Sequence, residues 1–128
     1  MPNPFEDLGK KKILMIDKTK AILNKLKEKL DTKYEFIHSP DSYKALLLIG
    51  SDKPQLVIMD SEVDGLGYEN VCKTIKENKE LKKIKVVVFG LEQKQITPEN
   101  LKAIGANKLI KRGAKINSFL SAIEQLIE

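Results

Sequence analysis

Short apolar blocks alternate with amphipathic segments along most of the chain. The apolar blocks predict five strands, over residues 12–16, 34–38, 56–59, 86–89 and 108–110. Residues 13–16 and 86–89 are apolar at every position rather than at every second one. Continuous apolar character is typical of a strand that is covered on both faces, as in a parallel sheet.

Apolar residues at helical spacing follow each strand and predict five helices. The third is expected over 68–77 and the last over 116–127. Capping residues mark the other three: Thr19 for the first helix, Ser39 and Pro40 for the second, which Gly50 ends, and Thr97 and Pro98 for the fourth, which Gly105 ends.

Five strands that are each followed by a helix require parallel pairing with right-handed crossovers. The predicted fold class is therefore α/β, an open doubly wound sheet with helices on both faces. In such a sheet the functional site lies at the carboxyl ends of the strands. Asp17, Asp60, Gly90 and the segment after Ile110 are expected on that rim.

Length and composition indicate one domain. The chain has 128 residues, of which 41% are hydrophobic. Residues 1–10 are predicted to be a flexible N-terminal extension and residues 11–128 the domain. No apolar run approaches the roughly 18 residues of a membrane span, and the N-terminus lacks a signal-peptide pattern, so we expect a cytoplasmic protein without membrane contact. The single Cys72 excludes an intrachain disulfide.

The formal net charge of +5 raises the possibility of nucleic-acid binding. Along the sequence, however, the lysines mostly alternate with glutamates in helical stretches, and Lys10 to Lys12 is the only run of three. A basic face must be contiguous to act on a polyanion. We therefore interpret most lysines as solvated helix faces and expect no direct nucleic-acid partner.

The ordered segments ILMID, LVIMD, VVVFG and GANKLIKRG resemble the receiver domain of bacterial response regulators over residues 11–128. The intervals from Asp60 to Gly90 and from Gly90 to Gly105 also agree with that family. The resemblance implies a flavodoxin-like (βα)5 fold with strand order 2-1-3-4-5. It also implies that Asp60, which ends the third strand, has the position of the aspartate that accepts a phosphoryl group from a histidine kinase.

Several functional positions of the family are substituted in this chain. Of the acidic pair that helps to hold Mg²⁺, Asp17 is present and the second acid is replaced by Lys18. The hydroxyl residue that ends the fourth strand is replaced by Gly90, and the aromatic switch residue of the fifth strand by Leu109. The lysine after the fifth strand aligns with Arg112, although the adjacent Lys111 would restore it after a slip of one residue.

These substitutions change the expected charge of the pocket. Asp17 and Asp60 are opposed by Lys18 and Arg112, so the formal charges cancel. We expect the Lys18 ammonium to pair with Asp60 in the place of the cation, so that no metal or other cofactor is required. If a metal binds at all, Asp17 and Asp60 are its ligands, and Glu62 is not expected to ligate it through its side chain.

The sequence therefore predicts an atypical receiver domain, impaired in phosphorylation, that acts in signalling as a protein-interaction module and not as an enzyme. The alternative is a functional receiver that is phosphorylated on Asp60 with Mg²⁺ bound, and an unrelated α/β module is a third interpretation. The partner is expected to be a histidine kinase or an output protein that contacts residues 96–102 and 108–115. We expect a monomer or a weak homodimer.

An enzymatic function finds little support in the residues. A nucleotide-binding α/β protein needs a glycine-rich turn after the first strand, and IDKTKA has none. His38 is the only histidine, and no motif ties it to a serine or cysteine nucleophile. We predict a structural or surface role for His38 and a core position for Cys72.

Overall fold

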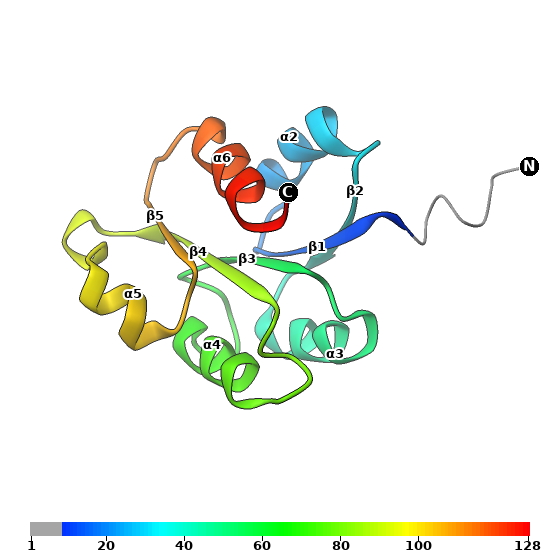
Figure 1. Ribbon diagram of the computed structural model, residues 1–128. Coiled ribbons are helices and arrows are strands. Elements are labelled where there is room, and N and C mark those ends of the chain that lie inside the picture. The colour runs from blue at the N-terminus through cyan, green and yellow to red at the C-terminus, as the bar shows by residue number, and fades with distance from the viewer. Residues whose placement is uncertain (1–8) are drawn as a thin grey trace, which may run out of the picture.

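The computed structural model describes residues 9–128 and contains one five-stranded parallel sheet (Figure 1). The strand order β2-β1-β3-β4-β5 confirms the predicted flavodoxin-like topology. Register is continuous between β1, β3 and their neighbours, and shifts only between Val88 and Leu91, where β4 pairs with β5. The strands are β1 (Lys11–Ile16), β2 (Tyr34–Ser39), β3 (Leu56–Asp60), β4 (Lys85–Leu91) and β5 (Lys108–Lys111).

Helices cover both faces of the sheet (Figure 1). Helices α2 and α6 pack on one face, and α3, α4 and α5 on the other. A short 3-10 helix, η1 (Gln93–Gln95), follows β4. The helices are α2 (Ala21–Leu30), α3 (Ser42–Asp52), α4 (Tyr68–Glu77), α5 (Pro98–Ile104) and α6 (Ile116–Ile127).

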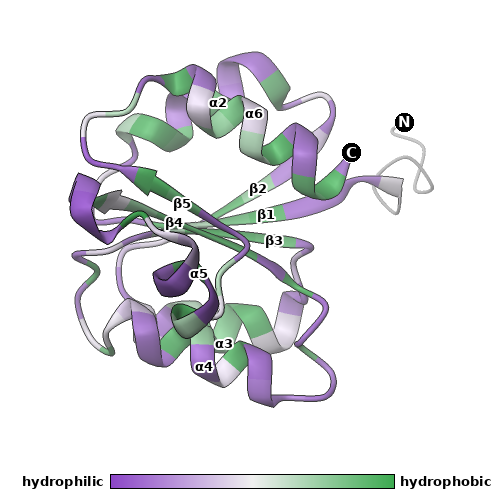
Figure 2. Cartoon of the chain, turned by 60° about the vertical axis from the view of Figure 1, so that its left-hand side comes forward, coloured by the Kyte–Doolittle hydropathy of each residue, from purple (hydrophilic) through white to green (hydrophobic). Residues whose placement is uncertain are grey.

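The two layers explain why the strands are apolar at consecutive positions. In β1, Leu14 belongs to the core under α3 and α4, whereas Ile13 and Met15 belong to the core under α2 and α6. All three side chains are at most 1% exposed. Figure 2 shows mainly hydrophobic colour in the interior of the central strands. Successive side chains of a strand point to opposite faces, so a sheet with two covered faces has no polar side.

Helix boundaries were predicted unevenly. Thr97 caps α5 by accepting from the Asn100 N–H at 3.1 Å, and Gly105 ends that helix with φ of 80°, as expected. The other two cap predictions were wrong. Lys20 and not Thr19 is the N-cap of α2, and Asp41 caps α3 by accepting from Lys44 N–H, because Ser39 is the last residue of β2. Helix α3 also continues through Gly50 to Asp52.

The predicted N-terminal extension, residues 1–10, lies outside the described residues up to position 8. In residues 9–128, no helix combines the length and apolar character that crossing a membrane requires.

Candidate functional site

The carboxyl edge of the sheet brings together the residues predicted for the site. Asp17 directly follows β1 and Asp60 ends β3. Gly90 lies near the end of β4, and Arg112 directly follows β5. Their arrangement follows from parallel pairing, because Asp60 is in register with Phe89, the neighbour of Gly90.

Asp17 is the most buried charged group of this edge, with 6% of its surface exposed. Burial, followed by the negative charge of Asp60, raises the pKa of its carboxyl group, and backbone N–H groups of Thr19 and Lys18 oppose the shift in part. Its main-chain carbonyl lies 2.9 Å from Nε2 of His38, which gives that imidazole a structural partner. Asp17 is therefore a buried carboxylate that no positively charged side chain of residues 9–128 neutralises by an ion pair.

Asp60 is half-buried at the end of β3. Its Oδ1 accepts a hydrogen bond from the main-chain N–H of Glu62 at 3.0 Å, which fixes the carboxylate at the start of the β3–α4 loop. Its proximity to Asp17 places two carboxylates side by side. Like charges in a partly buried setting favour a bound cation or a retained proton.

The predicted pairing of Lys18 with Asp60 is wrong. The Lys18 ammonium instead lies 3.4 Å from Oδ1 of Asp64, and both side chains are exposed, by 58% and 67%. Asp64 is held at this place because its carbonyl oxygen accepts from both N–H and Oγ–H of Ser42 in α3. An exposed pair leaves the ammonium hydrated, whereas a pair with Asp60 would require its desolvation. In residues 9–128, no lysine or arginine forms an ion pair with Asp17 or Asp60.

Gly90 differs from a hydroxyl residue in its backbone as well as in its side chain. Its φ of +80° is left-handed, and a β-carbon there would lie 2.9 Å from Oδ1 of Asp60 and 3.3 Å from Oγ of Ser61. Ser61 Oγ donates to the carbonyl oxygen of Gly90 at 2.9 Å. A β-branched residue is strongly disfavoured at such a φ. Sequence reasoning missed Ser61, whose only signal was its position next to Asp60.

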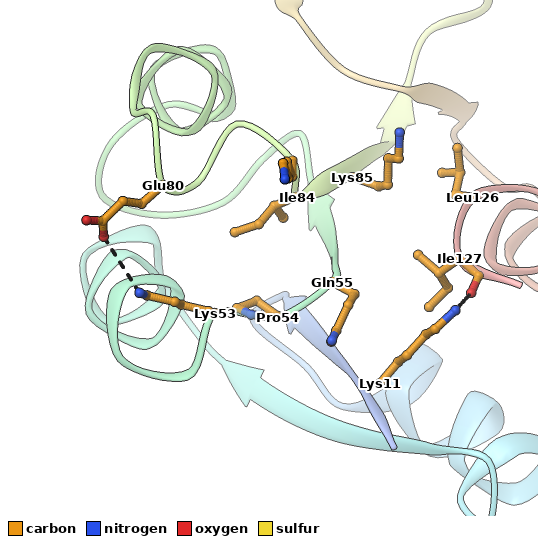
Figure 3. Close-up of a pocket in the computed structure, with 10 residues that line it drawn as sticks. Lys11, Lys53, Pro54, Gln55, Glu80, Ile84, Lys85, Leu126 and Ile127 are labelled. Carbon is orange, nitrogen blue, oxygen red and sulfur yellow. Dashed lines mark hydrogen bonds and ion pairs between the residues drawn. The ribbon is translucent and has the colours of Figure 1, made fainter. Parts of the chain in front are cut away.

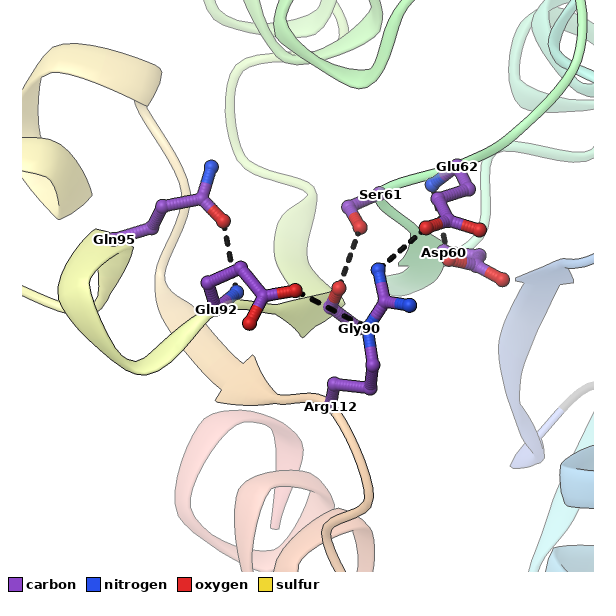
Figure 4. A network of polar contacts seen from close by, with 7 residues as sticks. All are labelled: Asp60, Ser61, Glu62, Gly90, Glu92, Gln95 and Arg112. Carbon is purple, nitrogen blue, oxygen red and sulfur yellow. Dashed lines mark hydrogen bonds and ion pairs between the residues drawn. The ribbon is translucent and has the colours of Figure 1, made fainter.

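Arg112 bridges two loops above the site (Figure 4). Its Nη2 donates to Oε1 of Glu62 at 2.5 Å, and its Nε lies 3.5 Å from Oε1 of Glu92. These contacts, the hydrogen bond to Glu62 first, raise the pKa of the guanidinium. Glu92 is itself anchored, since its N–H donates to Oε1 of Gln95 at 2.8 Å. The guanidinium that sequence reasoning assigned to the pocket is thus engaged by two exposed glutamates.

Beneath this bridge lies a cavity of about 290 Å³. Its lining includes Phe89 and Phe119, whose rings form an edge-to-face pair with centroids 5.2 Å apart. Lys111, the last residue of β5, is also among the lining residues. The polar lining includes Asp60, Glu62, Gly90, Lys111 and Arg112.

Leu109 is not at the rim. It is 6% exposed and packs in the core under α4 and α5, in the interior of β5. An aliphatic side chain at this position fills the core without a polar tip.

The carboxylates present fit a weak magnesium site better than an enclosed one. In the described residues, no group of three or more His, Cys, Asp or Glu side chains is placed to hold a metal ion. Mg²⁺ nevertheless binds proteins through one or two carboxylates while it keeps several waters. Asp17 and Asp60 supply two carboxylates, and the pKa of Asp17 is raised by burial first and by the negative charge of Asp60 second. They are the residues that would hold it.

The fold is flavodoxin-like, and solved structures share it. No protein-family model and no curated protein matches the sequence. The structure is similar to the chemotaxis response regulator CheY4 of Vibrio cholerae, with a TM-score of 0.79 and 16% identity over 92% of this chain and 99% of that one.

Two receiver domains of histidine kinases are also similar. One is that of Syntrophus aciditrophicus, with a TM-score of 0.76 and 21% identity over 91% of this chain and 89% of that one. The other is that of sensor kinase PA1611 from Pseudomonas aeruginosa, which holds a magnesium ion in its active-site cleft, with a TM-score of 0.78 and 14% identity over 93% of this chain and 98% of that one. At these identities the likeness establishes a shared fold.

Proposed function

We propose that this chain is a receiver-like domain of two-component signalling that is impaired in phosphorylation and acts by binding a signalling protein, without enzymatic activity of its own. The observation that carries this proposal is the backbone at Gly90. Its φ of +80° and the 2.9 Å approach of a β-carbon to Asp60 leave no room for the hydroxyl residue that the resemblance requires there.

The chemistry at Asp60 lacks two groups that would stabilise a transferring phosphoryl group. The fourth strand offers no side-chain hydroxyl, and the Arg112 guanidinium is engaged by Glu62 and Glu92. Phosphoryl transfer depends on donors and cations that are already in place around the phosphoryl oxygens. Loss of one such donor raises the barrier by about 3 kcal/mol. Slow phosphorylation is therefore expected even if a kinase reaches Asp60.

The conformational response is also affected. In the family that the sequence resembles, the hydroxyl and the aromatic residue move together, and here Gly90 and the buried Leu109 take their places. A ligand shifts an equilibrium only if it binds two states with different affinity. Without these two moving groups, a phosphoryl group at Asp60 has little means of selecting a second state.

The partner surface proposed for signalling comprises residues 96–102 and 108–115. A cavity of about 230 Å³ in this surface has a mainly apolar lining from α5, β5 and the residue Ile96 that precedes α5, and it includes Pro98, Leu101 and Leu109. The partner is a histidine kinase or an output protein, and the similarity to receiver domains of two histidine kinases supports this class. We propose a cytoplasmic monomer or weak homodimer that needs no cofactor and does not bind nucleic acid directly.

A second candidate has one specific observation in its favour. Because Lys18 pairs with Asp64, the acids at positions 17 and 60 are not neutralised by that lysine. A receiver that binds Mg²⁺ between Asp17 and Asp60 and accepts a phosphoryl group on Asp60 is compatible with this charge distribution. When bound, the ion would neutralise charge on the phosphoryl oxygens.

Intact-mass measurement with acetyl phosphate as the phosphodonor separates the two candidates. The full chain is incubated with the donor, with and without Mg²⁺, and compared with the matched variant Asp60→Asn. The first proposal predicts no stable addition of a phosphoryl group in either chain. Stoichiometric, Mg²⁺-dependent addition that Asp60→Asn abolishes would establish the second.

A further inference from the structure

The parallel sheet gathers lysines that are dispersed along the sequence. Lys11, Lys85 and Lys108 are the first residues of β1, β4 and β5, and Lys33 directly precedes β2. Lys53 lies three residues before β3. The amino ends of parallel strands share one edge, so these lysines lie opposite the acidic rim of Asp17 and Asp60.

This amino edge is hollowed. A cavity of about 340 Å³ opens between the starts of β1, β3 and β4 and the end of α6 (Figure 3). A second cavity of about 450 Å³ adjoins it and shares Lys11 and Ile127 as a common wall. We call the two together the amino-edge groove. Its length across several strands suits an extended ligand better than a compact one.

The groove combines positive walls with an apolar floor. Among residues 9–128, Lys11, Lys53, Lys83 and Lys85 line the first cavity against the single acid Glu80. Pro54, Ile84 and Ile127 are buried or nearly buried residues of the same cavity, and Leu126 is half-buried. This pairing of surfaces suits a ligand that carries both carboxylates and apolar side chains.

Some of the groove's polar groups are already engaged and others are not. Lys11 donates to the carbonyl oxygen of Ile127, and Lys53 lies 3.6 Å from Glu80. In the part of the chain that the structure describes, Lys83 and Lys85 form no ion pair or side-chain hydrogen bond. The charge of Lys85 is also felt by Lys76, whose pKa is lowered by burial and then by this neighbour.

Gln55 adds a directed donor to the same wall. Its Oε1 accepts from the main-chain N–H of Lys12 at 2.7 Å, so the amide nitrogen is left to donate to a ligand. Its own main-chain N–H donates to the Lys12 carbonyl at 3.0 Å, which holds the residue in place. A backbone carbonyl or a carboxylate of the ligand could accept a hydrogen bond from this amide nitrogen.

We propose that the amino-edge groove binds an acidic, partly apolar peptide segment of a partner protein. Its carboxylates pair with Lys83 and Lys85, and its apolar side chains rest on the half-buried Leu126. Nucleic acid fits less well, because its phosphate backbone would leave the apolar part of the groove lining without a partner. The ring of Tyr34, an aromatic residue of the groove, is 3% exposed and cannot stack on bases. The groove shares no lining residue with the cavity at Asp60 or with the cavity lined by α5 and β5.

The test uses a blocked hexapeptide of alternating glutamate and leucine, titrated into the ¹⁵N-labelled full chain. Amide shifts are expected at Gln55, Ile84 and Ile127. The double variant Lys83→Glu/Lys85→Glu should weaken binding by about tenfold, which corresponds to about 1.4 kcal/mol, or about 0.7 kcal/mol for each of two exposed charge pairs. The matched control is Lys25→Glu/Lys29→Glu on the exposed side of α2, which changes the net charge equally and should leave the affinity unchanged.

Other outcomes would overturn the proposal. Absence of shifts at the groove, or equal weakening by both double variants, would show that no specific site exists. Equal binding of a glutamine–leucine hexapeptide would remove the role of charge, and tighter binding of duplex DNA at the same amides would identify a different class of partner. Asp60→Asn should bind the peptide as the parent chain does, so the result is independent of the function proposed for Asp60.

Discussion

The backbone at Gly90 predicts a free-energy penalty that can be divided into two parts. Replacing Gly90 by alanine forces an L-residue to a φ of +80°, and its β-carbon meets Oδ1 of Asp60 at 2.9 Å. The left-handed conformation costs about 1–2 kcal/mol for an ordinary residue. Asp60 is hydrogen-bonded to Glu62 N–H and cannot move freely. We therefore expect a further penalty of about 1–2 kcal/mol, typical of overpacking.

The chain contains a matched control for each part. Gly113 has nearly the same φ, +78°, but no atom lies within 4 Å of the place that an added β-carbon would take, so Gly113→Ala should show the backbone cost alone. Gly50 lies in α3 with open space around it and no positive φ, so Gly50→Ala should stabilise the chain by about 0.5–1 kcal/mol.

Urea unfolding followed by circular dichroism measures the free energy of unfolding of Gly90→Ala, Gly113→Ala and Gly50→Ala against that of the parent chain. The expected order of stability is Gly50→Ala above the parent chain, then Gly113→Ala, then Gly90→Ala. In the double variant Asp60→Ala/Gly90→Ala the contact is removed, and the excess cost over Gly113→Ala should disappear as a coupling energy. The reasoning fails if Gly90→Ala is no less stable than Gly113→Ala.

Three further predictions concern other groups. Burial and the charge of Asp60 raise the pKa of Asp17, so ionisation of Asp17 at pH 7 destabilises the folded state. Asp17→Asn should therefore raise the urea midpoint at pH 7. This gain should vanish below the ordinary aspartate pKa of 3.8, where the carboxyl group is protonated in both the folded and the unfolded chain. Lys18→Ala should leave Mg²⁺-induced amide shifts at Asp17 and Asp60 unchanged, since its ammonium pairs with Asp64, and any clear change in their midpoint contradicts this. Burial raises the pKa of the Cys72 thiol to about 11, so a disulfide reagent at pH 8 should modify it only in urea; rapid reaction of the folded chain would show that the α4 core opens.

The sequence could predict the fold because the apolar pattern of each strand indicates how many of its faces are covered. Apolar side chains at consecutive positions of 13–16 and 86–89 require two covered faces, and this requirement selects a parallel sheet. The cap at Thr97 was found because its signal is local. The cap at Asp41 was missed because Ser39 has the same capping chemistry, and only pairing with β1 decides that it remains in the strand.

The site was less predictable because its contacts join distant segments. The partner of Lys18 depends on where Ser42 holds the loop at Asp64. This contact between the start of α3 and the β3–α4 loop is not revealed by the residue types. The left-handed φ of Gly90 and its bond from Ser61 are equally invisible in the sequence, in which Gly90 is only the absence of a hydroxyl. The basic edge was missed because five dispersed lysines become neighbours only in the parallel sheet.

The geometry at Gly90 also bears on whether the altered pocket is reversible by substitution. If only side-chain types had changed, Gly90→Thr with Lys18→Asp would restore a hydroxyl and an acid. The β4 backbone, however, shifts register between Val88 and Leu91, and Ser61 holds the carbonyl of Gly90 in that shifted conformation. In the present backbone a threonine β-carbon would face Asp60 at 2.9 Å from its Oδ1, so the obstacle is this close contact together with the left-handed φ. Gly90→Thr is therefore expected to require a change of the β4 backbone as well as of the side chain.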